Sequence, residues 1–273
     1  MTANSDATTL VNELLGNGIT VVGTPTYTGA ANASGLFTDG DPPLGIDSGV
    51  ILTTGTATDA EGPNLNFNDS SDASDDTSTA NGEAGDPDLT NLGGLNTFDA
   101  SVLEFEFQFG DGSTGGDLFF NYVFASEEYN EFVGGGVNDI FALFVNGTNV
   151  ALVPGTTDFV SVDTVNNGVN SSFFNDNTST GSFGSSLDIE YDGFTDVFTA
   201  QALNLPAGTN TLKLAIADAG DSILDSALLI EGDSISESHE IPFEAESALG
   251  LAALVGLIGV RKLRQRKSSN VEA

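Results

Sequence analysis

The chain has 273 residues, enough for one large domain with its own core, and it is strongly acidic, with 40 Asp and Glu against 6 Lys and Arg. Five of the basic residues lie between Arg261 and Lys267, so residues 1–260 hold one Lys against 39 carboxylates, a net charge of −38 that excludes nucleic acid as a partner. Since there is no Cys and only one His, disulfides, thiol catalysis, a Ser-His-Asp triad and multi-His zinc sites are excluded too.

A short helix is predicted near the N-terminal end, over residues 6–16. Asp6 can accept hydrogen bonds from the first turn as an N-cap, and Gly16 can end the helix. The apolar side chains follow helical spacing and share one face; they are Leu10, Val11, Leu14 and Leu15.

After residue 16 the hydrophobic pattern changes to period two, which is typical of strands. The clearest cases are VLEFEFQF at 102–109, SLDIEY at 186–191 and TLKLAI at 211–216. Further strands are expected at 18–22, 49–54, 117–125, 139–145, 150–153, 159–162, 196–203 and 226–231. Many short strands separated by Gly, Asn, Pro and Asp predict an all-β fold, a jelly-roll-like β-sandwich.

Residues 64–97 interrupt this pattern with a polar, acidic run that contains few side chains able to pack. We expect a long acidic loop or a partly disordered insertion there. The sandwich domain is then residues 1–232, with no second globular domain, followed by a linker at 233–246.

The C-terminal tail combines an uncharged apolar stretch, residues 247–260, with a basic end at 261–273. Its 14 residues give about 21 Å of helix, short of the roughly 30 Å hydrocarbon core. Because the stretch is apolar on every side and a basic stop signal follows at Arg261, Lys262 and Arg264, a membrane helix is favoured over a buried core helix.

The residues before this stretch, Ile241–Glu244, read IPFE. With the apolar helix and basic end they resemble the sorting tails of the PEP-CTERM type, with Pro242, Phe243 and Glu244 in place of Pro-Glu-Pro. The resemblance implies a membrane-bound processing enzyme that cleaves near the motif and passes an exported protein to the bacterial cell surface or beyond. The first residues, MTANSDATT, have no signal-peptide pattern, so we expect a truncated start. The alternative is a tail-anchored protein that faces the cytoplasm.

Two further segments interrupt hydrophobic strands with acidic residues, at 124–141 and 216–230. A sandwich gathers strand ends at one rim, so the two segments could meet around a hard cation, and Gly134–Gly136 would allow the sharp turn. Adjacent Glu127 and Glu128 should point to opposite faces if the strand continues. The predicted calcium ligands are Glu127, Glu128, Asn138, Asp139, Asp218, Asp221 and Asp225. The alternative is a set of solvated loop acids, since no EF-hand or glycine-rich calcium repeat is present.

These two segments also carry a family resemblance. FNYVFASEEYNEFVGGGVNDIFALFVNG and AIADAGDSILDSALLIEG, with upstream TYTGAANASGLFTDG and LGIDSGVILTTG, resemble the choice-of-anchor L domain over about residues 7–232. The resemblance implies an exported β-rich domain that occurs with different anchoring tails and has no established catalytic activity. It does not supply a ligand.

Three functions are compatible with the sequence. The first is a non-enzymatic surface protein, an adhesion, matrix or ligand-binding module with calcium-stabilised loops, whose partners are the membrane, a processing enzyme and an unknown surface or polysaccharide. The second is a glycosidase that uses Glu128 with Asp139 or Asp221, although Trp, a common sugar-stacking residue, is absent. The third is a structural coat or biofilm component.

Overall fold

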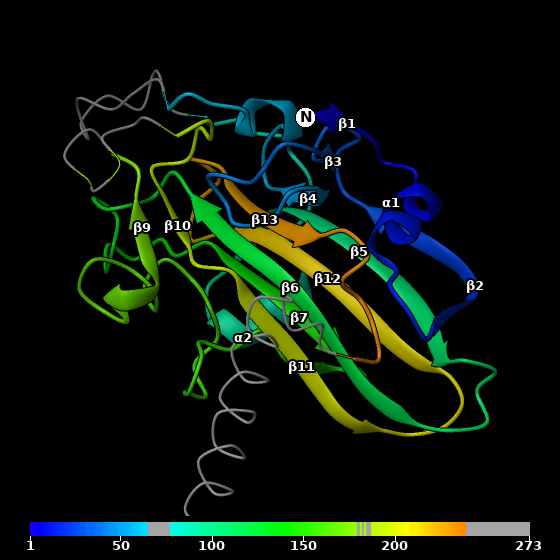
Figure 1. The fold of residues 1–273 in the computed structure, drawn as a ribbon. Helices are drawn as coiled ribbons and strands as arrows, with labels where there is room; N and C mark the ends of the chain where they lie inside the picture. Colours follow the sequence, from blue (N-terminus) through cyan, green and yellow to red (C-terminus); the bar gives the residue numbers. More distant parts are fainter. Residues whose placement is uncertain (65–76, 179–180, 182, 184–186, 239–273) are drawn as a thin grey trace, which may run out of the picture. The chain divides into compact units, whose positions relative to one another are not determined.

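In the computed structural model, residues 1–64, 77–178, 181, 183 and 187–238 are described, and their strands form two antiparallel sheets (Figure 1). The first sheet has the order β1 (Thr2–Ala3), β3 (Ser34–Phe37), β4 (Gly49–Thr53), β13 (Ser226–Glu231), β6 (Gly116–Ser126), β10 (Gly193–Thr195) and β9 (Phe174–Asp176), and β11 (Phe198–Leu205) also pairs with β6. The second has the order β2 (Ile19–Thr28), β5 (Thr97–Phe109), β12 (Asn210–Ala219), β7 (Ile140–Val145) and β8 (Thr148–Asn149).

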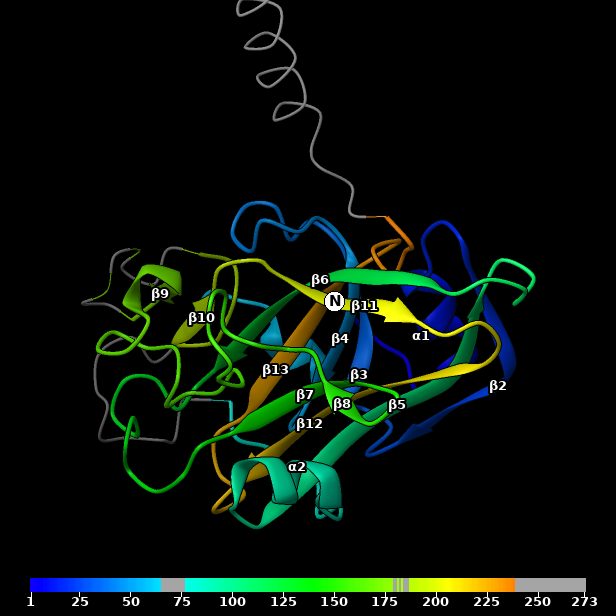
Figure 2. The same ribbon diagram turned by 90° about the horizontal axis from the view of Figure 1, so that it is seen from below.

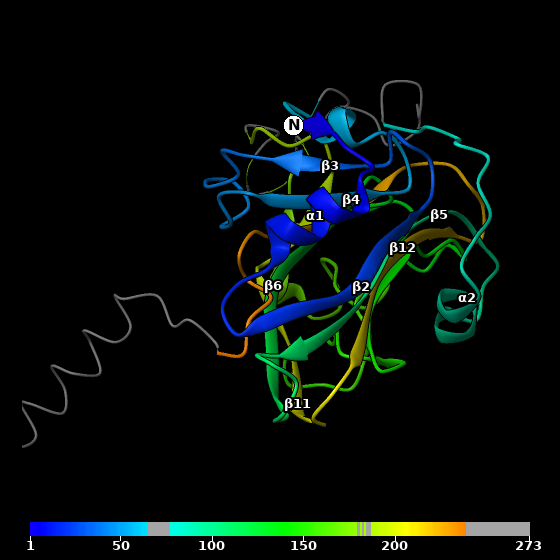
Figure 3. The same cartoon turned by 90° about the vertical axis from the view of Figure 1, so that its right-hand side faces the viewer.

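The main hydrophobic core lies between the two sheets and takes side chains from both. Tyr122 on β6 meets Phe141 on β7 with ring centroids 5.2 Å apart, and Phe124 stacks on the same Phe141 ring at 5.2 Å. Figure 3 shows the layers side by side, with β3, β4, β6 and β11 in one and β2, β5 and β12 in the other. The predicted β-sandwich is therefore confirmed; its jelly-roll connectivity stays a prediction.

The N-terminal helix is confirmed as α1 (Ala7–Leu14). The Asp6 side chain accepts the backbone N–H of Thr9 at 2.8 Å, as expected of an N-cap. Leu10, Val11 and Leu14 are fully buried, and the helix packs against β2 and β4 (Figure 3). The apolar stripe therefore closes one side of the core, and the helix ends one residue before the half-buried Leu15.

The prediction of a long acidic loop or a partly disordered insertion at 64–97 was wrong for α2 (Pro87–Gly93). Asp86 caps this helix, with its side chain accepting the N–H groups of Asp88 and Leu89 at 3.0 and 3.1 Å. Pro87 fits the first turn because it lacks an N–H to satisfy. The helix packs on β12, β7 and β5 (Figure 2). The capping signal was present in the sequence but hidden by the acidic composition; residues 65–76 lie outside the described residues.

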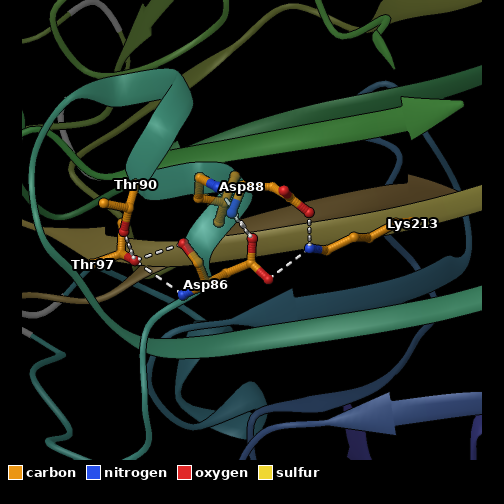
Figure 4. A network of polar contacts seen from close by, with 6 residues as sticks. Asp86, Asp88, Thr90, Thr97 and Lys213 are labelled. Carbon is orange, nitrogen blue, oxygen red and sulfur yellow. Dashed lines mark hydrogen bonds and ion pairs between the residues drawn. The ribbon is translucent and has the colours of Figure 1, made fainter. Parts of the chain in front are cut away.

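Lys213, on β12, holds α2 to the second sheet (Figure 4). Its Nζ lies 2.7 Å from Asp86 Oδ2 and 2.6 Å from Asp88 Oδ2, and 5.6 Å from the centre of the Phe144 ring. The Thr97 hydroxyl accepts the backbone N–H of Asp86 at 2.9 Å. The one lysine of residues 1–260 is thus used in a structural ion pair.

Three predicted strands were wrong. Residues 150–153 and 159–162 form only single bridges, Leu152 with Phe159 and Ser161 with Ile140, and 186–191 is bridged only at Ile189, with 186 outside the described residues. Ile189 and Tyr191 are nevertheless buried. Glu190, which lies between them, is buried as well, so the alternation in the sequence corresponds neither to a paired strand nor to burial of one face.

The last described residues are fastened to the body by backbone hydrogen bonds. Ile235 N–H donates to Leu14 O at 2.9 Å, and Gly16 N–H donates to Ile235 O at 2.9 Å. Ser236 and Phe119 exchange both of their backbone bonds at 3.0 Å. Among the described residues no helix has the length and apolarity to cross a membrane, and the predicted motif at 242–244, helix at 247–260 and basic end all lie outside them.

Candidate functional site

Two connections that cross between the sheets lie side by side at one end of the sandwich. The β6–β7 connection leaves the first sheet at Ser126 and enters the second at Ile140, while β12–β13 runs the opposite way from Ala219 to Ser226. Ser126 pairs with Ser226 in the first sheet, and Ile140 pairs with Ala217 in the second. The expectation that the two acidic segments meet is therefore confirmed.

Hydrogen bonds join the two connections through Asp139. Its Oδ1 accepts the N–H of Ala219 at 3.0 Å, and its Oδ2 accepts the hydroxyl of Ser226 at 2.6 Å. The Asp139 N–H in turn donates to Glu128 Oε2 at 3.2 Å, and the Ser226 hydroxyl lies 2.8 Å from that of Ser126. Asp139 therefore lies at the centre of a polar cluster built from both connections.

The acidic members of this cluster are internal rather than exposed on loops. Glu128 and Asp139 are each 1 % exposed, and Asp218 and Asp225 are each 2 % exposed. The Asp225 carboxylate accepts the Thr77 hydroxyl and the Thr79 N–H, both at 2.9 Å. The described part of the 64–97 region, through Thr77 and Thr79, thus also contributes to the cluster.

The strand does not continue to the two glutamates, since β6 ends at Ser126 and both lie in the turn that follows, but their side chains still have different partners. The Glu127 side chain accepts the N–H of Asp192 at 3.1 Å and that of Thr77 at 3.4 Å, whereas Glu128 faces Asp139. Glu127 is 2 % exposed, so both glutamates are buried, on different sides of the connection.

The remaining two predicted ligands have other partners. Asn138 Oδ1 accepts the N–H of Asp163 at 2.9 Å, and Asp221 Oδ1 accepts the N–H of Ile223 at 3.2 Å. Both residues are only half-buried. Gly134 and Gly136 have φ of 71° and 92°, the left-handed conformations that the sharp turn was expected to need.

The cluster is electrostatically strained. Burial raises the pKa of Glu128 and of Asp139 well above their usual range, and the neighbouring carboxylates, Asp139 for Glu128 and Asp221 for Asp139, raise them further. Burial also raises the pKa of Asp218, with Asp139 as the next cause, and the pKa of Asp225. At neutral pH the cluster therefore needs protons or a cation to offset the buried charge.

Oxygen ligands without nitrogen or sulfur suit a hard cation such as calcium. In the described part of the chain, no three His, Cys, Asp or Glu side chains are already arranged to hold a metal ion. Calcium remains a prediction, and any ion here would have to draw the carboxylates closer together.

The sequence analysis missed the hydroxyl groups of the cluster. Ser126 and Ser226 face each other across the β6–β13 ladder, and the Thr54 hydroxyl accepts the N–H of Ser226 at 3.0 Å and lies near the Asp218 carboxyl. A Ser beside the acids of both segments, in ASEE and LDS, was the available signal.

Comparison with known proteins identifies the family of the chain through a family model, but no individual curated protein or solved structure. The family model described as the choice-of-anchor L domain matches residues 1–236, which includes both connections of the polar cluster. No curated protein and no solved structure matches the chain. The chain therefore belongs to the choice-of-anchor L domain family, and this membership indicates a cell-surface protein.

Proposed function

We propose that the chain is an exported, non-enzymatic protein displayed at the bacterial cell surface, where it acts as an adhesion, matrix or ligand-binding module with calcium-stabilised loops. The observation that carries this proposal is the joining of two acidic connections at one end of a rigid sandwich. Loops that a rigid scaffold holds in this way are the usual place for binding residues.

The C-terminal tail would supply the attachment. The Pro242–Glu244 motif would direct the chain to a membrane-bound processing enzyme, and residues 247–260, with Arg261, Lys262 and Arg264 as the stop signal, would hold it in the membrane until then. The acidity of residues 1–260 suits an outer surface rich in divalent cations and keeps copies apart.

Burial speaks against the glycosidase alternative. Glu128 and Asp139 are each 1 % exposed, and the Asp139 N–H donates to Glu128 Oε2. A polysaccharide could not reach this pair without opening the strand ends. Asp221 is more exposed, but a glycosidase needs two carboxyl groups, and the proposed partner of Asp221 is the buried Glu128.

The test uses bacteria that export the full chain behind a supplied signal sequence. We expect intact cells to present the domain to antibody and to adhere to a polysaccharide or cell panel in calcium, with adhesion lost in chelator. A chain ending at Ser238 should be released in folded, soluble form and bind the same target without retaining cells. Hydrolysis of a panel polysaccharide that Glu128→Gln abolishes would establish the glycosidase instead, and display without any binding would establish a structural coat.

A further inference from the structure

The inference concerns where a cation would bind and which of the acidic residues would hold it. Four buried carboxyl groups lie on or beside the two connections: Glu128 and Asp139 on the first, Asp218 near the end of β12, and Asp225 directly before β13. The Asp139 N–H donates to Glu128 Oε2. Lys213, the single lysine of residues 1–260, is occupied by Asp86 and Asp88 on α2. The described body therefore brings no lysine or arginine to the cluster.

Asp218 supplies an observation independent of the clustering. The residue is 2 % exposed, and its Oδ1 has no hydrogen-bond partner among the described residues. Asp139 is the charged group that acts on it most strongly. A buried carboxylate oxygen without a partner is rare in folded proteins and calls for a bound water or ion.

We propose that Asp218 Oδ1, with the carboxylates of Asp139 and Glu128, binds one divalent cation of the calcium class, and that Asn138 and Asp221 are not ligands. This rests on the calcium part of the proposed function and narrows it to one place. Asn138 and Asp221 are only half-buried and their oxygens bond away from Asp139, to the N–H groups of Asp163 and Ile223. Asp218 Oδ1 is buried and has no hydrogen-bond partner among the described residues.

Hydroxyl groups would complete the oxygen shell. Ser226 donates to Asp139 Oδ2 at 2.6 Å, and the Thr54 hydroxyl lies near the Asp218 carboxyl. Calcium accepts six to eight oxygens in irregular arrangements, while magnesium requires a near-octahedral shell at shorter distances. Side chains that must shift to converge therefore favour calcium over magnesium.

Such a cation would connect four strand ends, because Glu128 and Asp139 flank the β6–β7 connection and Asp218 ends β12 next to the start of β13. With all three ligands at most 2 % exposed, the ion can enter or leave only when these connections open. We therefore expect slow binding and slow release in chelator.

The test measures thermal unfolding and calcium binding of the full chain in calcium, magnesium and sodium chloride at matched ionic strength. Calcium should bind with one site per chain and raise Tm by several degrees, since an ion at a hundredfold excess over Kd stabilises the state that binds it. Asp218→Asn should weaken calcium binding more than about tenfold. Asp221→Asn, three residues further along the chain and with the same change of charge, is the matched control and should weaken calcium binding much less, through the loss of a nearby charge alone.

Glu128→Gln provides a second variant if Asp218→Asn fails to fold, and it should weaken binding similarly. Calcium binding that survives both substitutions would overturn this site while leaving calcium-stabilised loops in place. A loss in Asp221→Asn as large as that in Asp218→Asn would overturn the assignment of ligands. No calcium binding, or a Tm shift that sodium chloride reproduces, would overturn both this site and the calcium part of the proposed function, with surface display unaffected.

Discussion

The ion pair between Lys213 and α2 gives a prediction whose magnitude follows from the structure. Lys213→Met keeps most of the aliphatic stem and removes the ammonium group. The Lys213 and Asp86 side chains are 15 % and 9 % exposed, so their 2.7 Å contact is largely shielded from water. The Asp88 side chain is 58 % exposed, so its contact with Lys213 is screened.

A hydrogen bond between charged groups contributes about 1.5–3 kcal/mol, and an exposed pair about 0–1 kcal/mol. In the variant, Asp86 Oδ1 keeps its bonds from the N–H groups of Asp88 and Leu89. The cost should therefore stay below the about 3–5 kcal/mol of a fully buried ion without a partner. We expect Lys213→Met to lower the free energy of unfolding by about 2–3 kcal/mol.

The measurement is urea unfolding of the full chain, followed by circular dichroism and by the fluorescence of its 4 tyrosines. The control, Asp88→Asn, removes only the exposed partner and should cost less than about 1 kcal/mol. In a double-mutant cycle, Lys213→Met and Asp86→Asn should couple by about 1–2 kcal/mol. A loss below about 0.5 kcal/mol for Lys213→Met, or no coupling, would show that the ion pair does not hold α2.

The same variant predicts a pH dependence. Burial lowers the pKa of Lys213, but the bonds to Asp86 and Asp88 outweigh it and raise this pKa above the ordinary 10.5. The folded state then holds the proton more tightly than the unfolded state. The stability difference between the unmodified chain and Lys213→Met should therefore be constant from neutral pH to about pH 10 and disappear as pH rises through the raised pKa. A stability difference between the two chains that grew with pH would show that the ion pair of Lys213 is not its cause.

Two pairs of substitutions test the interior. The Tyr122 hydroxyl is buried without a partner among the described residues, whereas that of Tyr129 donates to a backbone carbonyl at 2.8 Å. Tyr122→Phe should leave the free energy of unfolding unchanged or raise it by about 1 kcal/mol, whereas Tyr129→Phe should lower it by about 1 kcal/mol. If both substitutions lowered it equally, the two hydroxyl groups would not differ in their hydrogen bonding as described. A Cβ at Gly55 would overlap the Asp225 carboxylate, so Gly55→Ala should lower Tm by several degrees, while Gly168→Ala, which has room, should not.

Local signals in the sequence were sufficient for α1 and for the long strands. The N-cap Asp6 and the apolar stripe that follows it define α1 within one short segment. The alternation of apolar and polar residues in β5 can likewise be recognised without knowledge of distant parts of the chain. The α2 helix was missed because the acidic composition hid its local capping signal, Asp86 and Pro87, and because the contact that anchors it is not local. Lys213, its main polar anchor, lies 127 residues from Asp86 along the chain, and no pattern near 86–93 announces that contact.

For the candidate site, sequence predicted that the two acidic segments meet, because a sandwich brings strand ends together. It could not predict that Glu128, Asp139 and Asp218 are inside, since acidic residues are mostly exposed and only the register of β6 with β13 and of β7 with β12 covers them. Nor could it show that the side-chain oxygens of Asn138 and Asp221 accept backbone N–H groups, from Asp163 and Ile223 respectively.

The fastening of Ile235 and Ser236 has a mechanical consequence for a protein held at its C-terminal end. If the C-terminal tail holds the domain as proposed, drag would load the chain at Ser238. The tension would reach the bond of Glu237 to Asn17 first, and then the backbone bonds of Ser236 to Phe119 and of Ile235 to Leu14 and Gly16. Ile235 lies parallel to Leu15, whereas Ser236 lies antiparallel to Phe119, so the pull meets strand contacts of both directions within two residues. Force applied at this end would break these bonds before it strained β13 and the core behind it. Under load, this short segment should therefore detach first.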